Sequence, residues 1–183
     1  LITWSKARPD LAGRELSDIA EELGCDIFSA AAQLQPAGAV YFAMAEEDVQ
    51  RILSHPNAMI GSDGLPHDEH PHPRLWGTFP RVLGHYCRDL KLFSLEEAVR
   101  RMTGYSAETF GLIGRGVLKT GAFADITIFN EDTVLDRATF DKPMTPASGI
   151  DTVMVNGSIV WEHGCATGHR PGHVLRHGGA RPN

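Results

Sequence analysis

The sequence predicts an α/β protein with a small β unit toward its C-terminus. Between residues 14 and 60, segments with helical spacing of apolar residues alternate with short apolar runs, an order typical of parallel α/β units. Beyond Gly114 the spacing becomes that of strands, and Asn156-Gly157 is a strong hairpin signal. We therefore expect an α/β part over residues 1–113, a β segment over 114–167 and a surface tail over 168–183.

The first expected element is a helix from Arg14 to Leu23, because its apolar residues recur every three or four positions and Gly24 follows as a stop. A run of strand formers covers Ala39 to Met44, and the apolar run Ala58 to Ile60 suits a strand buried on both faces. Helices are expected over residues 26–34 and 46–53, which gives the order helix, strand, helix, strand.

The second half begins with a predicted helix from Thr78 to Leu90. Ser94 and Glu97 form a capping box, which predicts the start of a further helix, and a short helix should follow from Ser106. The predicted strands are Ala124–Phe129, Thr152–Val155 and Ser158–Glu162, the last two joined by the Asn156-Gly157 turn.

Composition narrows the choice of partner. The net charge is −6, whereas phosphate binding needs a concentrated excess of Lys and Arg, so we expect a small molecule and no nucleic acid. No apolar run is long enough to span a membrane, so no membrane partner is expected. Cys25, Cys87 and Cys165 are odd in number and widely spaced, which favours reduced thiols in a cytoplasmic protein or simply buried small side chains. The sequence does not determine the oligomeric state.

The segment from Met59 to Arg74 is the strongest candidate site. Asp63 follows the predicted strand at its carboxyl end, the place where α/β proteins bind ligands and hold catalytic groups. The alternative is that Asp63 caps the glycine-rich turn with its side chain. Arg74 offers a bidentate fork for a carboxylate, and its alternative is an ion pair with Asp68 or Glu69.

Three histidines share this loop. His67, His70 and His72 are of the type that binds zinc, but Pro71 and Pro73 hold the chain extended, and the spacing is unlike that of a structural zinc site. Hydrogen-bonded loop histidines are therefore favoured over a metal site made by this loop alone.

Three blocks of sequence carry a family resemblance. IGSDGLPHDEHPHPRLWGTFPRVLG, from Ile60 to Gly84, resembles the N-acyl-D-amino-acid deacylases (D-aminoacylases) of the amidohydrolase superfamily. Gly114 to Asn130 and Gly149 to Gly164 resemble the segments that lead from the barrel of amidohydrolases into their β-sandwich and close it. The resemblance implies the last β/α units of a metal-dependent (β/α)₈ barrel, followed by a small C-terminal β-sandwich segment.

The resemblance also implies an activity, the hydrolysis of an N-acyl-D-amino acid to a carboxylate and a free D-amino acid. Asp63 matches the family aspartate that takes a proton from the metal-activated water and delivers it to the leaving amine, and that touches a weakly held second metal. Arg74 matches the position that binds the substrate carboxylate, and His67 is assigned to substrate binding through the shape of the site.

The chain departs from the family in one respect. The early H-x-H pair, the Cys and the two further His that hold the principal zinc have no counterpart, because His70-Pro71-His72 belongs to the later block. We therefore expect a C-terminal fragment that is inactive alone, with the principal zinc ligands upstream of it. The alternatives are an amidohydrolase acting on another linear or cyclic amide or a dipeptide, or a noncatalytic module.

Overall fold

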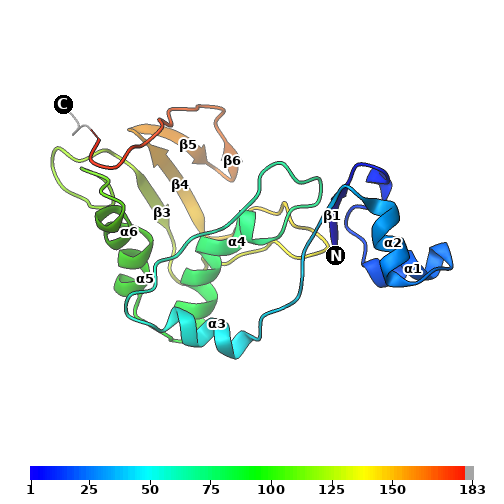
Figure 1. The fold of residues 1–183 in the computed structure, drawn as a ribbon. Coiled ribbons are helices and arrows are strands. Elements are labelled where there is room, and N and C mark those ends of the chain that lie inside the picture. The colour runs from blue at the N-terminus through cyan, green and yellow to red at the C-terminus, as the bar shows by residue number, and fades with distance from the viewer. Residues whose placement is uncertain (180–183) are drawn as a thin grey trace. The chain divides into compact units, whose positions relative to one another are not determined.

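The computed structural model describes residues 1–179, which form two compact units (Figure 1). Unit 1 combines three separate segments, Leu1–Ala45, Ser62–Trp76 and Ala138–Thr145. Unit 2 contains Glu46–Gly61, Gly77–Arg137 and the chain from Pro146 onward. The candidate loop around Asp63 therefore belongs to unit 1, although most of its neighbours in sequence belong to unit 2.

Unit 1 holds a two-stranded antiparallel sheet and two short helices. Strand β1 (Ile2–Ser5) pairs with β2 (Ala37–Ala39), and the segment between them contains the 3-10 turn η1 (Pro9–Leu11), α1 (Leu16–Leu23) and α2 (Ile27–Leu34). The apolar faces of these elements enclose a core whose buried members are Ile2, Leu11, Ile19 and Leu34.

Local signals set the ends of both helices in unit 1. Gly24 ends α1 in the left-handed conformation at φ 62°, which glycine adopts without steric penalty. The Asp26 carboxylate accepts the main-chain N–H groups of Phe28 and Ser29 and so begins α2. The predicted helices over residues 14–23 and 26–34 are thus confirmed to within two residues.

Unit 2 builds its core from helices that pack beside a sheet. Helix α3 is Glu46–Leu53. Helix α4 (Arg74–Arg81), which begins in unit 1 and enters unit 2 at Gly77, runs directly into the wider π-helix η2 (Val82–Asp89). Helix α5 (Leu95–Met102) is followed by α6 (Gly104–Thr109). The Ser94 hydroxyl accepts the N–H of Glu97, which confirms the predicted start of α5. The buried core consists of Val82, Leu83, Tyr86, Cys87, Ala98 and Val134.

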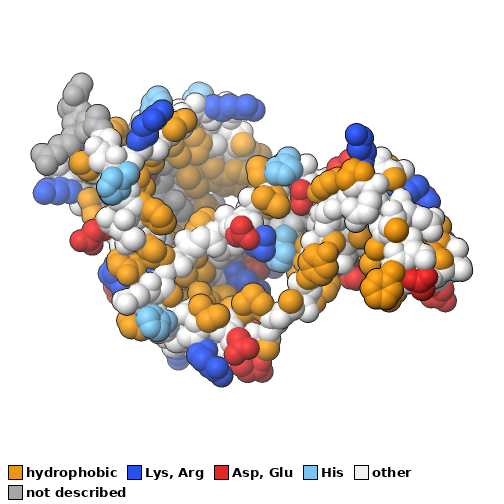
Figure 2. Space-filling model, viewed as in Figure 1, with side chains coloured by type: hydrophobic (Ala, Val, Ile, Leu, Met, Phe, Trp, Pro, Cys, Tyr) orange, Lys and Arg blue, Asp and Glu red, His pale blue; other side chains and the backbone are white. Residues whose placement is uncertain are grey.

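The sheet of unit 2 is antiparallel, in the order β3 (Ile126–Phe129), β4 (Ile150–Val155), β5 (Ser158–Glu162) and β6 (Cys165–Ala166). Asn156 and Gly157, at φ 46° and 78°, turn β4 into β5 as the sequence predicts. Hydrophobic side chains gather in the recess over β3 and β4 (Figure 2). The completion of this sheet into a β-sandwich and the boundary near Gly114 stay predictions.

Two predicted strands are wrong. Residues 58–60 form no strand, and of the run 39–44 Ala39 alone is in a strand, as the last residue of β2. The strand pairs within residues 1–179 are all antiparallel, so the expected parallel pairing is wrong for this chain. A parallel strand needs neighbouring strands whose hydrogen bonds satisfy its backbone, and the strand pairs of the described residues include none for residues 58–60 or 41–44. Tyr41, Phe42 and Met44 are consequently exposed.

The tail makes specific contacts over its described part. The Asn156 side chain donates a hydrogen bond to the carbonyl of Pro171, and the N–H of Gly178 donates to the carbonyl of Gly111. Specific hydrogen bonds therefore fix residues 168–179 to the rest of unit 2, and the remainder of the predicted surface tail lies outside the described residues. Between residues 1 and 179 there is no helix with the length and hydropathy to cross a membrane.

Candidate functional site

Asp63 and Arg74 form the centre of the candidate site in unit 1. Arg74 Nη2 lies 2.7 Å from Asp63 Oδ2, and Arg74 Nε donates a 2.8 Å hydrogen bond to the main-chain carbonyl of the same aspartate. The Asp63 side chain is 81% exposed and that of Arg74 is 39% exposed. An ion pair this open to water contributes at most about 1 kcal/mol, so a competing anion or cation exchanges with it readily.

The backbone of the loop presents the Asp63 carboxylate from a sparsely populated conformation. Asp63 has φ 48°, in the left-handed region that side chains other than those of Asn, Asp and His seldom adopt. Gly64 follows, and a Cβ there would lie 2.8 Å from the Cα of Leu75, so the loop packs directly against the start of α4. Such backbone strain is concentrated at functional sites. The structure thus places the two predicted site residues, Asp63 and Arg74, side by side, where the loop packs against the start of α4.

His70 is a structural residue of this loop. Its ring Nε2 is 2.6 Å from the carbonyl oxygen of Phe140. The main-chain N–H of His70 donates a hydrogen bond to the carbonyl of Thr3 in β1. The ring lies so close to Gly13 that a Cβ at that glycine would meet His70 Nδ1 at 2.8 Å. His70 is thus held in the loop by two hydrogen bonds and by its packing against Gly13.

His72 is a half-buried, neutral histidine. Its Nδ1 accepts the N–H of Arg74 at 3.0 Å, and its ring meets the Phe140 ring edge to face, with centroids 5.1 Å apart. Burial lowers the pKa of the His72 imidazole, the Arg74 guanidinium lowers it further, and Asp63 partly opposes both. His72 therefore fixes the first residue of α4 and keeps the region beside the ion pair free of an additional positive charge.

His67 lies apart from these contacts. Its ring is 73% exposed, and Nε2 is 3.8 Å from Oδ1 of Asp68. The structure therefore does not join His67 to Asp63 or Arg74, and its assignment to substrate binding stays a prediction. The sequence offers Asp68 as an alternative partner of Arg74, but the ion pair of Arg74 is with Asp63. Burial of the Asp68 side chain could not be read from a loop so rich in charged residues.

The described residues do not fit a zinc ion. Between Leu1 and Gly179 no group of three or more His, Cys, Asp or Glu side chains is placed to hold a metal. His70 and His72 are engaged in the contacts given above, and the Asp63 carboxylate is bound to Arg74. The weak second-metal role of Asp63 thus finds no further ligand in this part of the chain.

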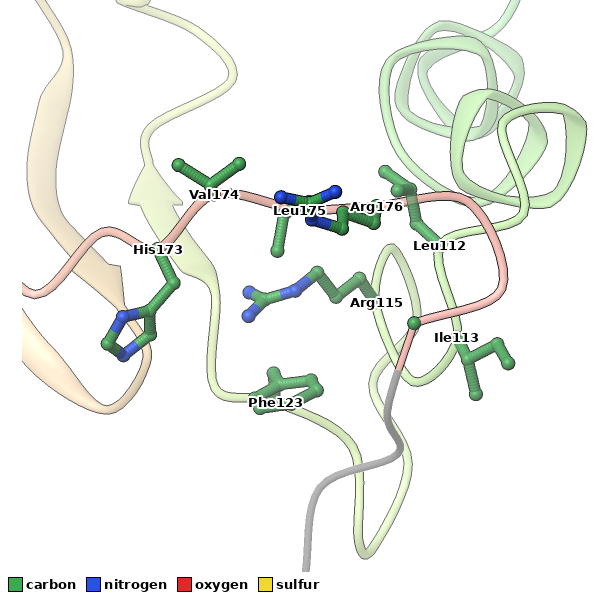
Figure 3. A pocket seen from close by; sticks show the side chains of 9 residues that line it. Leu112, Ile113, Arg115, Phe123, His173, Val174, Leu175 and Arg176 are labelled. Carbon is green, nitrogen blue, oxygen red and sulfur yellow. The ribbon is translucent and has the colours of Figure 1, made fainter.

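Two hollows in unit 2 lie away from these residues. One, of about 610 Å³, is apolar and runs between α5 and β3, with Val99, Met102 and Phe129 in its wall. The other, of about 270 Å³, lies under the tail beside Arg115 and Phe123 (Figure 3). The Arg115 guanidinium is stacked 4.0 Å from the Phe123 ring centre and pairs with Asp125 and Asn156, so it holds the β4–β5 hairpin.

The sequence of this chain, including the candidate loop, matches a known protein family. The model described as "Amidohydrolase family" matches residues 16–161, most of the chain and the whole candidate loop. The chain belongs to the amidohydrolase family. This amidohydrolase is 58% identical to a D-aminoacylase of Alcaligenes xylosoxydans xylosoxydans and 53% identical to an N-acyl-D-glutamate deacylase of the same organism, over 96% of its length in each case. It spans 36% of the length of these relatives.

Solved structures agree with the sequence comparison. A crystal structure of D-aminoacylase matches 96% of the amidohydrolase chain with a TM-score of 0.91 and 57% identity. An N-acyl-D-glutamate deacylase from Bordetella bronchiseptica, complexed with zinc and a phosphonate that mimics the tetrahedral intermediate, matches with a TM-score of 0.90 and 55% identity. The chain covers 37% of each of these structures.

Proposed function

We propose that this chain is part of an N-acyl-D-amino-acid deacylase in which Asp63 moves the proton and Arg74 binds the substrate carboxylate. The observation that carries the proposal is the contact between these two side chains, 2.7 Å apart on a strained loop. A carboxylate and a guanidinium are the two groups that hydrolysis of an acylated amino acid requires from this loop. The 58% identity to a D-aminoacylase supports the choice of substrate.

In the proposed reaction Asp63 transfers a proton twice, once as water adds to the acyl carbon and once as the amine leaves. Its carboxylate accepts a proton as a water oxygen bonds to the acyl carbon, and the resulting tetrahedral centre then loses its C–N bond. Asp63 returns the proton to the departing nitrogen, so the products are a carboxylate and a free amine. A D-amino acid is the expected amine because the relatives named above act on that class.

Arg74 exchanges partners during binding in this proposal. The α-carboxylate of the substrate takes the place of Asp63 on the guanidinium, which frees the aspartate to accept a proton. The exchange costs little free energy because the ion pair is exposed to water. The hydrogen bond from Arg74 Nε to the main-chain carbonyl of Asp63 can persist throughout and keeps the fork oriented.

The proposal includes a larger framework. The α/β part would supply the last β/α units of a metal-dependent (β/α)₈ barrel, and the sheet β3 to β6 would belong to the adjoining β-sandwich. The principal zinc ligands would lie in residues that the longer relatives have and this chain does not contain. The cytoplasmic location and the small N-acyl-D-amino acid as partner remain parts of the same proposal.

A chimaera tests the activity. Residues 1–183 replace the matching segment of the Alcaligenes D-aminoacylase, and hydrolysis of N-acetyl-D-leucine, N-acetyl-D-glutamate and N-acetyl-D-aspartate is compared with that of the L-enantiomers. We expect hydrolysis of at least one D-substrate at a rate within about tenfold of the parent, since a misplacement of catalytic groups by 1 Å already costs about a hundredfold. A folded chimaera that hydrolyses none of these D-substrates contradicts the proposal.

The first prediction concerns Asp63. Asp63→Asn keeps the shape of the side chain but cannot accept the proton, so kcat of the chimaera should fall by about 10² to 10⁴, the usual contribution of a general base. Asp10→Asn, which alters an exposed aspartate paired with Arg8 on the same unit, serves as the matched control. Steady-state kinetics in which Asp63→Asn retains full kcat would remove Asp63 from this role.

A second candidate is hydrolysis of a cyclic amide, since a dihydroorotase of Lactobacillus acidophilus is 32% identical over 100 residues. That match covers 48% of this chain, against 96% for the D-aminoacylase. Assaying dihydroorotate beside the N-acetyl-D-amino acids separates the two candidates. Faster turnover of the cyclic substrate would favour the second.

A further inference from the structure

Asp68 is a buried carboxylate with an unsatisfied oxygen. Its side chain is 7% exposed, and Oδ1 makes no hydrogen bond within residues 1–179. Removing a carboxylate from water costs several kcal/mol unless a cation or hydrogen-bond donors compensate it. An apolar side chain of similar size would therefore stabilise unit 1 more than Asp68 does in this conformation.

Two other groups of the loop that could pair with a carboxylate are already in contact with other partners. Arg74 pairs with Asp63, and His70 Nε2 lies 2.6 Å from the carbonyl oxygen of Phe140. The exposed ring of His67 lies beside Asp68, with Nε2 3.8 Å from Oδ1. A movement of about 1 Å brings this pair to the usual distance of a charge-assisted hydrogen bond, about 2.8 Å.

We propose that Asp68 is a positioning residue for His67, and that bound substrate closes the 3.8 Å gap between them. In the closed arrangement Nε2–H of His67 donates to Asp68 Oδ1, which fixes the tautomer and leaves Nδ1 as an acceptor. Nδ1 then accepts the amide N–H of the N-acyl-D-amino acid. This inference rests on the proposed function and extends it, because it assigns recognition of the amide N–H, which neither Asp63 nor Arg74 supplies.

Binding to the 183-residue chain provides the test, with dissociation constants measured by NMR titration of N-acetyl-D-leucine. Asp68→Leu and His67→Ala should each weaken binding about tenfold, the value of one hydrogen bond to a charged group. The double variant should bind no more weakly than either single variant, since the two residues act as one unit. Asp68→Asn keeps an oxygen acceptor and should stay within about threefold of the wild type.

Two controls make the readout specific. Glu69→Leu removes the exposed acid next to Asp68 and should leave affinity unchanged. N-acetyl-N-methyl-D-leucine lacks the amide hydrogen, so the Asp68→Leu and His67→Ala substitutions should not change its dissociation constant. A merely structural role for Asp68 would weaken both ligands alike.

Unfolding in denaturant separates the two roles independently. Asp68→Leu should raise the unfolding midpoint, because it removes an uncompensated buried charge, whereas Glu69→Leu should not. A fall in the midpoint for Asp68→Leu, additive effects in the double variant, or no binding by the wild-type chain would each overturn the inference. Hydrolysis by the chimaera together with any of these results would leave the proposed function standing, whereas failure of the chimaera to hydrolyse any D-substrate would overturn that function itself.

Discussion

In the candidate loop, two exposed charged side chains are paired with each other, whereas the buried carboxylate has an oxygen without a hydrogen bond in the described part of the chain. Asp63 and Arg74 are paired although both are open to water, whereas Asp68 is buried and its Oδ1 is unpaired within the described residues. Exposed pairs contribute little to stability, and buried unpaired charges reduce it. Stability therefore explains neither arrangement, and the proposed roles of these residues in substrate binding would account for both.

The second prediction concerns Arg74. Arg74→Ala should raise the KM of the chimaera for N-acetyl-D-leucine about tenfold or more, because the substrate loses a bidentate partner. The free energy of unfolding should change by less than about 1 kcal/mol, as for other exposed pairs. Arg8→Ala is the matched control, since Arg8 forms an equally short pair with Asp10 and is similarly exposed. Equal effects of the two substitutions on KM would refute the anchor role.

The third prediction concerns His72 and pH. Its pKa is lowered in the folded state, so below about pH 6.5 the unfolded chain binds a proton that the folded chain excludes. The stability associated with His72 is therefore complete above that pH and is lost as the pH falls toward its folded pKa. His72→Asn keeps an acceptor for the N–H of Arg74 but does not titrate. The unfolding midpoint of this variant should fall less between pH 7 and pH 5 than that of the wild type, and parallel curves would contradict the assignment.

Among the elements, η2 shows most clearly how close packing decides structure. The main-chain carbonyl of Val134 approaches Gly84 so closely that a Cβ at this position would clash with its oxygen. Arg88 Nη1 also donates a 2.9 Å hydrogen bond to this carbonyl. A π-helix places its backbone farther from the helix axis than an α-helix does, and such turns are rare outside constrained sites. Gly84 is thus the contact that lets the segment after β3 lie against η2.

The fourth prediction follows from this contact. Gly84→Ala should reduce the free energy of unfolding by about 1 to 3 kcal/mol, the usual penalty of overpacking. Alanine is favoured over glycine in a helix by about 1 kcal/mol, so a net loss shows that the clash prevails. Gly172→Ala is the control, because nothing lies within 4 Å of a Cβ at that position. Chemical denaturation measures both, and a stabilised Gly84→Ala variant would contradict the packing.

At the scale of the whole molecule, the elements that sequence reasoning predicted are those with local causes. Helix α3 was predicted to the residue, and the caps at Asp26 and Ser94 and the turn at Asn156-Gly157 depend on neighbours a few positions away. The strand expected over residues 58–60 failed because strand formation depends on distant partners. Strand β1 escaped notice for the same reason, since its partner β2 lies more than thirty residues along the chain.

The features of the candidate site also divide into those predictable from local sequence and those that depend on distant contacts. The choice of Asp63 and Arg74 came from motif and resemblance, and their adjacency follows from a loop of eleven residues. The pKa of His72 is lowered chiefly by burial, and its ring packs against that of Phe140, a residue far along the chain. The burial of the Asp68 side chain likewise becomes visible only in the folded unit. Contacts at that separation leave no periodic pattern in the sequence, so these two features required the structure.

The fifth prediction concerns metal. Because residues 1–179 offer no cluster of metal ligands, the 183-residue chain should contain far less than one equivalent of zinc after dialysis. Its melting temperature should be unchanged by EDTA, since residues 1–179 offer no ligand cluster through which a structural metal could contribute to folding. Stoichiometric zinc by elemental analysis, or melting that shifts with the chelator, would show that the chain builds a site of its own. The zinc-loaded chimaera provides the positive control.

The close packing of Gly13 against the His70 ring restricts which amino acids can occupy positions 13 and 70 together in homologues. Gly13 has φ 84° and no room for a Cβ, so two separate constraints exclude every other residue while His70 is present. A lineage that replaces His70 with a smaller side chain relaxes the steric constraint but not the conformational one. Residues Asn or Asp should therefore appear at position 13 in homologues that have lost the histidine, and glycine should be retained wherever the histidine is kept.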